Sequence, residues 1–393
     1  MTRAVIPLAL LLGSFAWSFV YVSLPFYIQR LSPLPAMDTL RWTGWILGIT
    51  PLMTVVMAPV WGRLAERGNP KRFYVIVQAL QALAFFGMAL AGSLLSLFGV
   101  RLVLGLVGAS STFAFMIAGR AEPREAVQRR LAAMQSMMTV GQIIGPLAGA
   151  LVAVRIGFRG SFVLGAAVLA GCAFLVGVAA ASPPAAPERV SGGRRREWAG
   201  VLAVSALVLG ASIQVSFLAS VLPQVVSTLG VSDERTLSVG GMLIFVSGIA
   251  AALGSVLAPR LAAFGDDRRV IGWLMVASSA LLIGLAPLSS VWAFGPVLFA
   301  QMLCVSPVFP IAVGAIAQRA SGGAIGFVNS ARIAASFLGP VVSTTVLSWS
   351  STAVLYVIMG LIGLVWVPIA FAFSSHPGAL GSGLRPPRQP PSR

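Results

Sequence analysis

The chain has 393 residues, of which 58% are hydrophobic and only 9% are charged. Soluble globular proteins carry about 25% charged residues, so the composition excludes soluble and disordered classes. Lys and Arg outnumber Asp and Glu by 27 to 10. We assign this excess to loops on the cytoplasmic side of a membrane and not to a nucleic-acid partner. Since a membrane-spanning helix needs about 20 apolar residues, we predict an all-α integral membrane protein.

Twelve apolar runs follow in chain order, and we predict that each is a transmembrane helix. A stretch rich in Pro, Gly and Arg divides them into two groups of six. The runs lie at 4–28, 44–62, 73–92, 95–118, 131–154 and 161–182, and then at 198–225, 238–259, 270–289, 291–317, 326–349 and 352–374. The predicted parts are an N-terminal six-helix bundle (1–182), a cytoplasmic linker (183–197), a C-terminal six-helix bundle (198–374) and a disordered cytoplasmic tail (375–393).

The distribution of positive charge predicts the orientation. With the N-terminus inside, twenty Lys and Arg residues fall in cytoplasmic segments and five fall in outer loops, while Arg101 and Arg332 lie within spans. Positive residues accumulate on the cytoplasmic side of membrane proteins. We therefore expect a multi-pass protein of the inner (plasma) membrane with both termini in the cytoplasm.

An internal repeat relates the two groups of spans. Matching segments recur at separations of 194 to 198 residues: Arg63-Leu64-Ala65 as Arg260-Leu261-Ala262, Lys71-Arg72 as Arg268-Arg269, and Gly145-Pro146 as Gly339-Pro340. A set of matches near one offset indicates two halves of the same design. Pseudo-symmetric halves of this kind place a substrate site between them near the middle of the membrane.

The loop after the second run reads WGRLAERGNPKRF over residues 61–73. It resembles the loop motif of the major facilitator superfamily, Gly-x-Leu-Ala-Asp-Arg-x-Gly-Arg-Lys. The residues assigned to this motif are Gly62, Leu64, Glu66, Arg67, Lys71 and Arg72, with Glu66 in place of the family's Asp. We expect Gly62 to allow close helix approach and Asn69 to accept a left-handed turn. The resemblance implies that Glu66 docks this loop against the eleventh span in the outward-open state.

Two further motifs lie within spans. Arg101, Gly105 and Gly108 resemble the family's fourth-span motif, Arg-x-x-Gln-Gly, with Leu104 at the Gln position. In the fifth run, GQIIGPLAGAL resembles the motif of the superfamily's drug antiporters. Its glycines, spaced by four, line one helix face and permit tight packing, and a proline kinks that helix. The residues of this motif are Gly141, Gly145, Pro146 and Gly149.

Polar residues inside spans usually face the bundle interior, and on this ground we select cavity candidates. They are Gln142, Gln214, Gln301, Asn329 and Arg332. No Asp or Glu lies in the middle of a span, so only Asp38 and Glu66 remain as proton carriers. The arginines Arg101 and Arg332 would make a positive cavity that favours neutral or anionic substrates. In the other interpretation, Arg101 is a structural hydrogen-bond donor and Arg332 extends to the inner interface.

Together the motifs are most similar to those of bacterial twelve-span multidrug-efflux members, the drug:proton antiporters. This resemblance implies export of small amphipathic compounds by alternating access. An importer or facilitator of a neutral or anionic metabolite is the first alternative, and a non-transporting scaffold or sensor is the second. An enzyme is not expected, since no nucleophile, base and acid occur together. One His and two Cys predict no metal site and no cofactor. The expected partners are a small-molecule substrate and the lipid bilayer, with no nucleic acid, and the chain is expected to be a monomer.

Overall fold

The structure is a computed structural model that describes residues 2–108, 110–119, 124–180, 198–317 and 322–372. Every regular element in these residues is an α-helix, which confirms the all-α prediction. The first half contains α1 (Thr2–Leu31), α2 (Ala36–Arg67), α3 (Pro70–Leu90), α4 (Leu94–Leu106), α5 (Ser110–Gly119) and α6 (Arg124–Ala179). The second half contains α7 (Trp198–Ser216), α8 (Leu218–Thr228), α9 (Asp233–Ala262), α10 (Asp267–Gly284), α11 (Val291–Val305), α12 (Val308–Ala317), α13 (Gly322–Trp349), α14 (Thr352–Val365) and α15 (Val367–Ala372). The predicted linker and tail lie outside the described residues.

Nine helices of the described residues are long and apolar enough to cross a membrane, or ten when the bent pair α7–α8 counts as one span. Helix α6 occupies the place of two predicted spans. Its apolar part, Ala133–Ala179, is 47 residues long, about twice what one crossing needs. The two parts of α6 are separated at Gly157, whose φ of +75° is a conformation that suits glycine.

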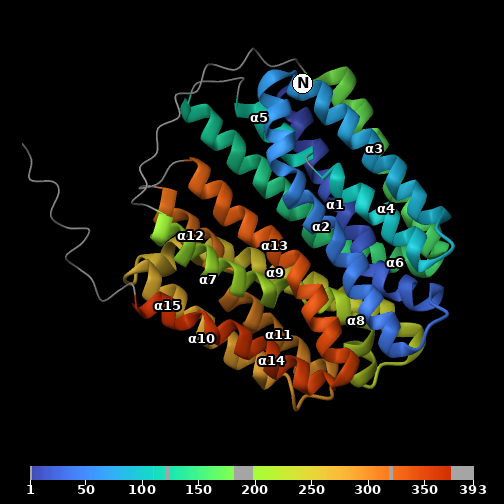
Figure 1. The fold of residues 1–393 in the computed structure, drawn as a ribbon, viewed down its shortest axis with the longest axis vertical. Helices are drawn as coiled ribbons and strands as arrows, with labels where there is room; N and C mark the ends of the chain where they lie inside the picture. Colours follow the sequence, from blue (N-terminus) through green and yellow to red (C-terminus); the bar gives the residue numbers. More distant parts are fainter. Residues whose placement is uncertain (1, 109, 120–123, 181–197, 318–321, 373–393) are drawn as a thin grey trace, which may run out of the picture.

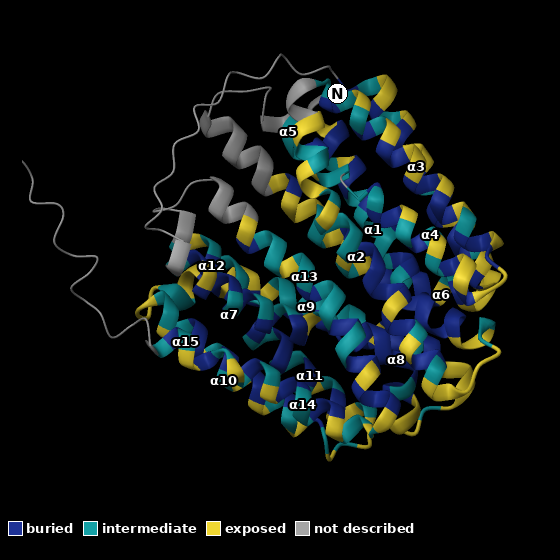
Figure 2. Ribbon diagram, viewed as in Figure 1, coloured by how far each residue is buried: buried dark blue, intermediate teal, exposed yellow. Residues whose placement is uncertain are grey.

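Helices of the first half lie on one side of the molecule and most helices of the second half lie on the other (Figure 1). Within the first half, α1 and α3 pack mainly against α6. The two halves meet where α13 packs against α2 and α9 packs against α6. Buried residues gather where these helices face each other, and exposed residues occupy the outer helix faces (Figure 2).

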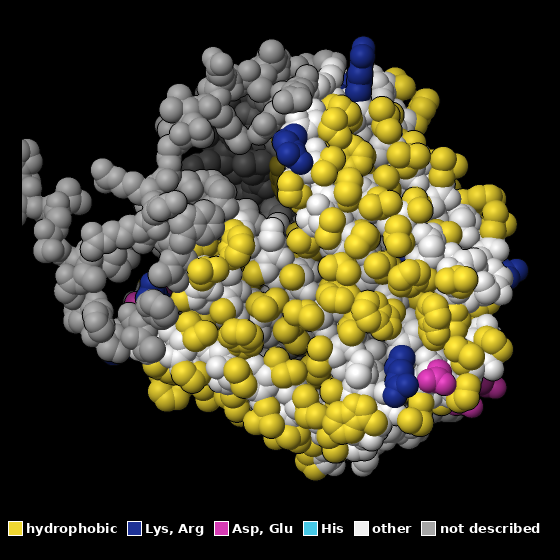
Figure 3. All heavy atoms as spheres, viewed as in Figure 1, with side chains coloured by type: hydrophobic (Ala, Val, Ile, Leu, Met, Phe, Trp, Pro, Cys, Tyr) yellow, Lys and Arg dark blue, Asp and Glu magenta, His cyan; other side chains and the backbone are white. Residues whose placement is uncertain are grey.

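The outer face of the described helices is strongly hydrophobic. Figure 3 shows one side of the molecule, on which hydrophobic side chains predominate and charged side chains are few and scattered. Phe86, Leu90, Phe174, Val256 and Trp292 are among the exposed large side chains, and Trp292 is 90% exposed. A soluble monomer rarely exposes so large an apolar surface. A lipid bilayer provides the apolar surroundings that these faces require.

The internal repeat predicted from sequence is visible in the packing. In the first half, a Cβ added to Gly145 would lie 2.8 Å from Ser18 Cβ and 2.9 Å from Phe19 N. In the second half, a Cβ added to Gly339 would lie 3.2 Å from both Ser216 Cβ and Phe217 N. The Gly-Pro segments of α6 and α13 therefore rest on equivalent Ser-Phe steps, in α1 and at the end of α7. These Ser-Phe partners were not among the segments that suggested the repeat, so they support it separately.

The loop between α2 and α3 differs from the prediction. Asn69 has φ of −83° and ψ of 110°, so the expected left-handed conformation is wrong. Its side-chain Oδ1 instead accepts a hydrogen bond from Lys71 N at 2.9 Å, and Pro70 begins α3. Asn is a preferred N-cap residue, and Pro is favoured in the first turn because its missing N–H has no helical partner there. The Asn-Pro pair thus starts a helix and does not form a left-handed turn.

Candidate functional site

A cavity of about 610 Å³ lies between the two halves. Helices α1 to α6 line it from one side, and α7, α8, α9, α11 and α13 line it from the other. Its volume is in the range of pockets that bind small molecules, which is about 300–1,000 Å³. The position between pseudo-symmetric halves is the one expected for a transporter site.

Arg101 of α4 forms part of the cavity wall and is only 2% exposed. Its Nε donates to the Ile46 carbonyl at 3.2 Å, and its Nη2 donates to the Leu47 carbonyl at 3.4 Å. A guanidinium has five N–H donors, and no carboxylate of the described residues forms an ion pair with this one. An arginine in the middle of a span costs about 2.5–3.5 kcal/mol on insertion scales, so its retention beside a cavity needs a structural or functional reason.

Two glutamines of α3 also line the cavity and are bound differently. Gln81 donates to the Val107 carbonyl at 2.7 Å and accepts from Trp17 Nε1 at 3.4 Å. Gln78 is 2% exposed, and its Oε1 has no hydrogen-bond partner among the described residues. Buried polar groups are normally hydrogen-bonded, and an exception needs an explanation such as an absent water or ligand. Gln81 is therefore fixed by the protein, whereas Gln78 Oε1 is a buried acceptor without a partner among the described residues.

The fourth-span motif packs α4 against α2. Thr50 Oγ1 donates to the Arg101 carbonyl at 2.7 Å. A Cβ added to Gly105 would lie 2.6 Å from Met53 Cβ, and one added to Gly108 would contact the Thr54 side chain. These three motif residues lie on one face of the chain, three or four positions apart. The glycines thus bring α2 close enough for its carbonyls to receive the guanidinium of Arg101.

One end of the cavity is closed by glycines that lie in contact with the opposite half. A Cβ added to Gly44 of α2 would lie 3.0 Å from the Pro340 carbonyl oxygen and would also overlap Thr344. A Cβ added to Gly241 of α9 would lie 3.2 Å from the Pro146 carbonyl oxygen and would overlap Ala150. Gly44 and Gly241 are 197 residues apart, which is also the separation of the two loop motifs. Their contact residues, Pro340 and Pro146, are 194 residues apart, which is the separation of the two Gly-Pro segments. We call this the closed end; it lies beside the loops at 32–35, 229–232 and 350–351.

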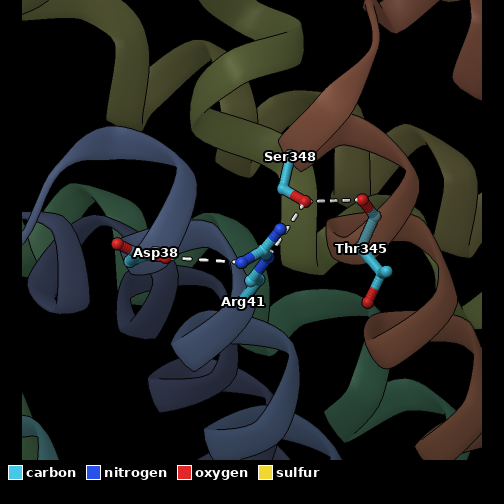
Figure 4. A network of polar contacts seen from close by, with 4 residues as sticks. All are labelled: Asp38, Arg41, Thr345 and Ser348. Carbon is cyan, nitrogen blue, oxygen red and sulfur yellow. Dashed lines mark hydrogen bonds and ion pairs between the residues drawn. The ribbon is translucent and has the colours of Figure 1, made fainter.

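A polar contact joins the two halves at the closed end (Figure 4). Arg41 Nε of α2 donates to Ser348 Oγ of α13 at 3.4 Å, and Ser348 Oγ donates to the Thr345 carbonyl at 2.7 Å. Arg41 also pairs with Asp38 at 3.5 Å, where both side chains are about half exposed. Exposed pairs of this kind contribute about 0–1 kcal/mol. The glycine contacts therefore dominate the closure, and Asp38 lies at the surface and not in the cavity wall.

The structure places the residues of the loop motif as follows. Nothing lies within 4 Å of a Cβ added to Gly62, so the expected close helix approach is wrong for this conformation. Leu64 and Arg72 are exposed, and Lys71 Nζ donates to the Ala180 carbonyl at 2.6 Å, at the end of α6. The side chains of Glu66 and Arg67 lie outside the described part of the chain. In the second half, Arg269 is exposed and Arg268 is partly buried.

Of the polar residues selected as cavity candidates, Gln142 is exposed and lines the cavity. The other four are absent from its described lining. Gln301 is fully buried, and neither polar atom of its side chain has a partner among the described residues. Arg332 is exposed; its Nε donates to Asn329 Oδ1 at 3.3 Å, and its guanidinium lies 4.8 Å from the centre of the Phe309 ring.

Gln214 lies in the core of the second half and joins α7, α10 and α14. Its Nε2 donates to Ser279 Oγ at 2.8 Å and to the Met359 carbonyl at 3.4 Å, and its Oε1 accepts from Ser278 Oγ at 2.8 Å. All the partners are buried. Removing one member of a satisfied buried network leaves the others without partners. The network therefore holds this half together as a unit.

We expect Gln214→Leu to destabilise the protein by about 1–3 kcal/mol, because it removes the buried hydrogen bonds to Ser278 and Ser279 and to the Met359 carbonyl. Thermal unfolding of the purified protein in detergent measures the effect. Gln224→Leu is the matched control, since the side-chain oxygen of Gln224 is buried without a hydrogen-bond partner among the described residues, so its removal is expected to cost nothing. Equal unfolding temperatures for the two variants would contradict the assigned network.

Sequence reasoning missed several residues of this site. Gly44 and Gly241 belong to no motif considered, although the repeat offset of 197 residues relates them and would have marked them as a pair. Gln78 lies in the third run with Gln81, and two glutamines among apolar residues were a signal of the same kind that selected Gln142. The local sequence around Gln78 does not show that it faces the same cavity as Arg101.

Comparison with known proteins supports this description. The family model described as Major Facilitator Superfamily matches residues 6–263. The chain is 28% identical to an uncharacterized MFS-type transporter, YuxJ, of Bacillus subtilis, over 81% of this chain and 83% of the relative. It is 26% identical to the multidrug resistance protein MdtG of Serratia proteamaculans, over 72% of this chain and 71% of the relative.

A solved structure shows the same fold. A bacterial homolog of the human lysosomal transporter Spinster, in an inward-facing and occupied conformation, superposes with a TM-score of 0.76 at 15% identity, over 95% of this chain and 96% of the other. The family match spans well over half of the chain, and the fold agrees over nearly its whole length. This chain is a membrane transport protein, not an enzyme, and it belongs to the major facilitator superfamily.

Proposed function

We propose that the protein is a secondary-active transporter that exports small amphipathic or drug-like compounds by alternating access. The observation that carries the proposal is the cavity between the halves, which is enclosed at one end by contacts that α2 makes mainly with α13 and α6 makes mainly with α9. Such contacts can separate while those within each half persist, which opens the other side of the site. The relative named as a multidrug resistance protein supports export of drug-like compounds as the role.

The proposed arrangement has twelve spans in two six-helix bundles, at 1–182 and 198–374, with the linker at 183–197 and both termini in the cytoplasm of a bacterial cell. Counting α6 as two spans raises the ten candidates to eleven, and α10 (Asp267–Gly284) lies where the remaining span is predicted. The excess of Lys and Arg in one set of loops supports the orientation. In this orientation the closed end is the outer end, and the structure is the inward-open state. The loop motif with Glu66 would then act in the opposite, outward-open state.

One observation favours a second candidate, a facilitator of a neutral or anionic metabolite. No Asp or Glu occurs among the described residues that line the cavity, while proton-coupled transporters commonly carry a titratable group in the membrane. Asp38 lies at the surface of the closed end. Proton antiport in this chain would therefore need a carrier outside the cavity wall, which a facilitator would not need.

Transport in proteoliposomes with an imposed pH gradient tests the proposal. The panel consists of a cationic dye, a neutral drug and an organic anion of similar size. Accumulation that follows the pH gradient is the result expected for antiport, and Asp38→Asn and Glu66→Gln are then the first variants to compare. Flux that follows only the gradient of the compound itself would favour the facilitator. No flux above that of empty liposomes for all three compounds would contradict the proposed function.

A further inference from the structure

One buried polar group in the wall of the cavity lacks a protein partner. Gln78 of α3 lines the cavity and is only 2% exposed. Its Oε1 is buried and accepts no hydrogen bond from the described residues. Unpaired buried atoms of the described residues also occur in Ser205, Gln224, Gln301 and Tyr356, none of which belongs to the described cavity lining. Among the described residues, Gln78 is thus the one such group that adjoins the cavity.

The surroundings of Gln78 leave its amide room to turn. Gly13 of α1 also lines the cavity, and a Cβ added to it would lie 3.5 Å from Gln78 Nε2, which is an ordinary contact distance. No hydrogen bond from a described residue holds Gln78 Oε1 in its present place. The terminal torsion of a glutamine is broad and roughly two-fold, so half a turn exchanges its oxygen and its nitrogen. The acceptor oxygen can therefore be presented to a molecule in the cavity.

Gln81, three residues further along α3, lines the same cavity with its amide already bonded. Its Oε1 accepts from Trp17 Nε1 at 3.4 Å, and its Nε2 donates to the Val107 carbonyl at 2.7 Å. A buried acceptor without a partner is unfavourable, and a group that donates to it removes that cost. Of these two glutamines, only Gln78 therefore has an acceptor to offer to a ligand.

The partner that Gln78 Oε1 needs is a hydrogen-bond donor, and the cavity restricts which kind. An ionised carboxylate offers acceptors only. An ammonium group donates, but it would share the cavity with Arg101, which is a permanent cation. No Asp or Glu occurs among the described lining residues to compensate for a second positive charge, and like charges repel strongly in surroundings of low polarity. A neutral N–H or O–H group donates without adding charge.

We propose that Gln78 is a specificity-determining residue that accepts a hydrogen bond from the substrate, and that the preferred substrates are amphipathic compounds with a neutral donor, such as the N–H of a secondary amide. This inference rests on the proposed transport function and adds the class of substrate to it. It also explains why the wall of the cavity retains a buried acceptor that the described protein does not satisfy, since the substrate supplies the donor.

The test compares equilibrium binding of two neutral fluorescent probes, dansylglycine N-methylamide and dansylglycine methyl ester. The ester has an oxygen atom where the amide has its N–H, and the two are otherwise alike in shape. The full chain is used in detergent micelles. The amide preference is the dissociation constant of the ester divided by that of the amide. We expect it to be about 10-fold higher in wild type than in Gln78→Met, whose side chain has a similar length and no amide.

Two further variants show whether the acceptor oxygen is responsible. Gln78→Glu keeps an acceptor oxygen whether its carboxyl group is ionised or protonated, so its amide preference is expected to stay at least about 3-fold above that of Gln78→Met. Gln301→Met is the matched control. Gln301 is also buried with an unpaired amide among the described residues, but it does not belong to the described cavity lining. This control is expected to leave the amide preference unchanged.

Equal amide preference in wild type and Gln78→Met would overturn the proposal, and it is the result expected if water alone satisfies Gln78. An equal loss of preference in Gln301→Met would also overturn it. Tighter binding of the cationic probe dansylethylenediamine than of the N-methylamide would overturn the neutral class. If Gln78→Glu does not fold, the comparison of wild type, Gln78→Met and Gln301→Met still decides.

Uptake of the same two neutral probes into proteoliposomes separates this inference from the proposed function. Uptake of both probes with an amide preference that Gln78→Met leaves unchanged would overturn the role of Gln78 and leave the transporter. Amide-selective binding that depends on Gln78, with no uptake of either probe, would leave the binding site and overturn the proposed function.

Discussion

Gly149→Leu is expected to lower the thermal unfolding temperature by about 3–4 °C or to prevent folding altogether. A Cβ at Gly149 of α6 would lie 2.7 Å from the carbonyl carbon and 2.9 Å from the Cα of Phe19 in α1, and it would overlap the carbonyl oxygen. These are backbone atoms in a helix, so they cannot move aside as a side chain would. Overpacking commonly costs about 1–3 kcal/mol, and contact with backbone places this variant at the upper end of the range.

Gly171→Leu is the matched control for that experiment. Gly171 lies in the same helix, is exposed, and has nothing within 4 Å of an added Cβ. Leucine forms helices better than glycine by close to 1 kcal/mol, so this variant is expected to unfold at or slightly above the wild-type temperature. An unfolding temperature for Gly149→Leu within about 1 °C of the control would show that α1 and α6 are not in the contact described.

Gly44→Trp combined with Gly241→Trp is expected to open the closed end and to trap the transporter with its cavity facing the other way. Each tryptophan would occupy space now filled by α13 or by α6. The contacts inside each half are unaffected, so separation of the halves relieves the overlap. Each substitution is expected to raise the free energy of the present state by about 1–3 kcal/mol. A change of this size shifts the ratio between the present state and the state with the closed end open by about 5- to 150-fold for each substitution. Transport should fall sharply while the folded yield is retained.

Accessibility of the cavity measures this change. Cys172 and Cys304 are replaced by alanine, and a reporter cysteine is placed at the exposed cavity residue Gln142. A membrane-impermeant maleimide outside right-side-out vesicles is expected to label the reporter in the double variant and to leave it unlabelled in the parent. Gly99→Trp is the control, since Gly99 is exposed and has free space around an added Cβ. Equal labelling of parent and double variant would refute the assignment of Gly44 and Gly241 to the closure.

The parts of the fold that depend on composition and period were predictable from sequence. Apolar runs of about 20 residues have one stable form in a bilayer, which is a helix with all backbone groups paired. The repeat offset also predicted that Gly145 and Gly339 occupy equivalent places, and their contacts with Phe19 and Phe217 agree. The positions at which spans break, such as Phe217 between α7 and α8, were not predicted, because they depend on packing between helices that are distant in the sequence.

The site was only partly predictable, for a physical reason. Arg101 and Gln142 stand out in sequence as polar residues in apolar runs, and both line the cavity. Gln214 stands out equally, yet its partners Ser278 and Ser279 lie more than sixty positions away and hold it in the core. Sequence shows that a buried amide needs partners. Whether those partners are protein or ligand depends on contacts between distant helices.

The measurement that most directly tests the central claim is transport of the cationic dye, the neutral drug and the organic anion by a variant in which the cavity itself is filled. Ala251 of α9 lines the cavity, and Ala251→Trp introduces a large side chain there. Ala293→Trp is the control, because Ala293 is exposed on the outer face of α11. In proteoliposomes with matched amounts of folded protein, we predict that Ala251→Trp transports at less than about one-tenth of the wild-type rate, equivalent to more than about 1.4 kcal/mol, while Ala293→Trp transports normally. Wild-type transport by Ala251→Trp would contradict the claim that substrates pass through the cavity between the halves.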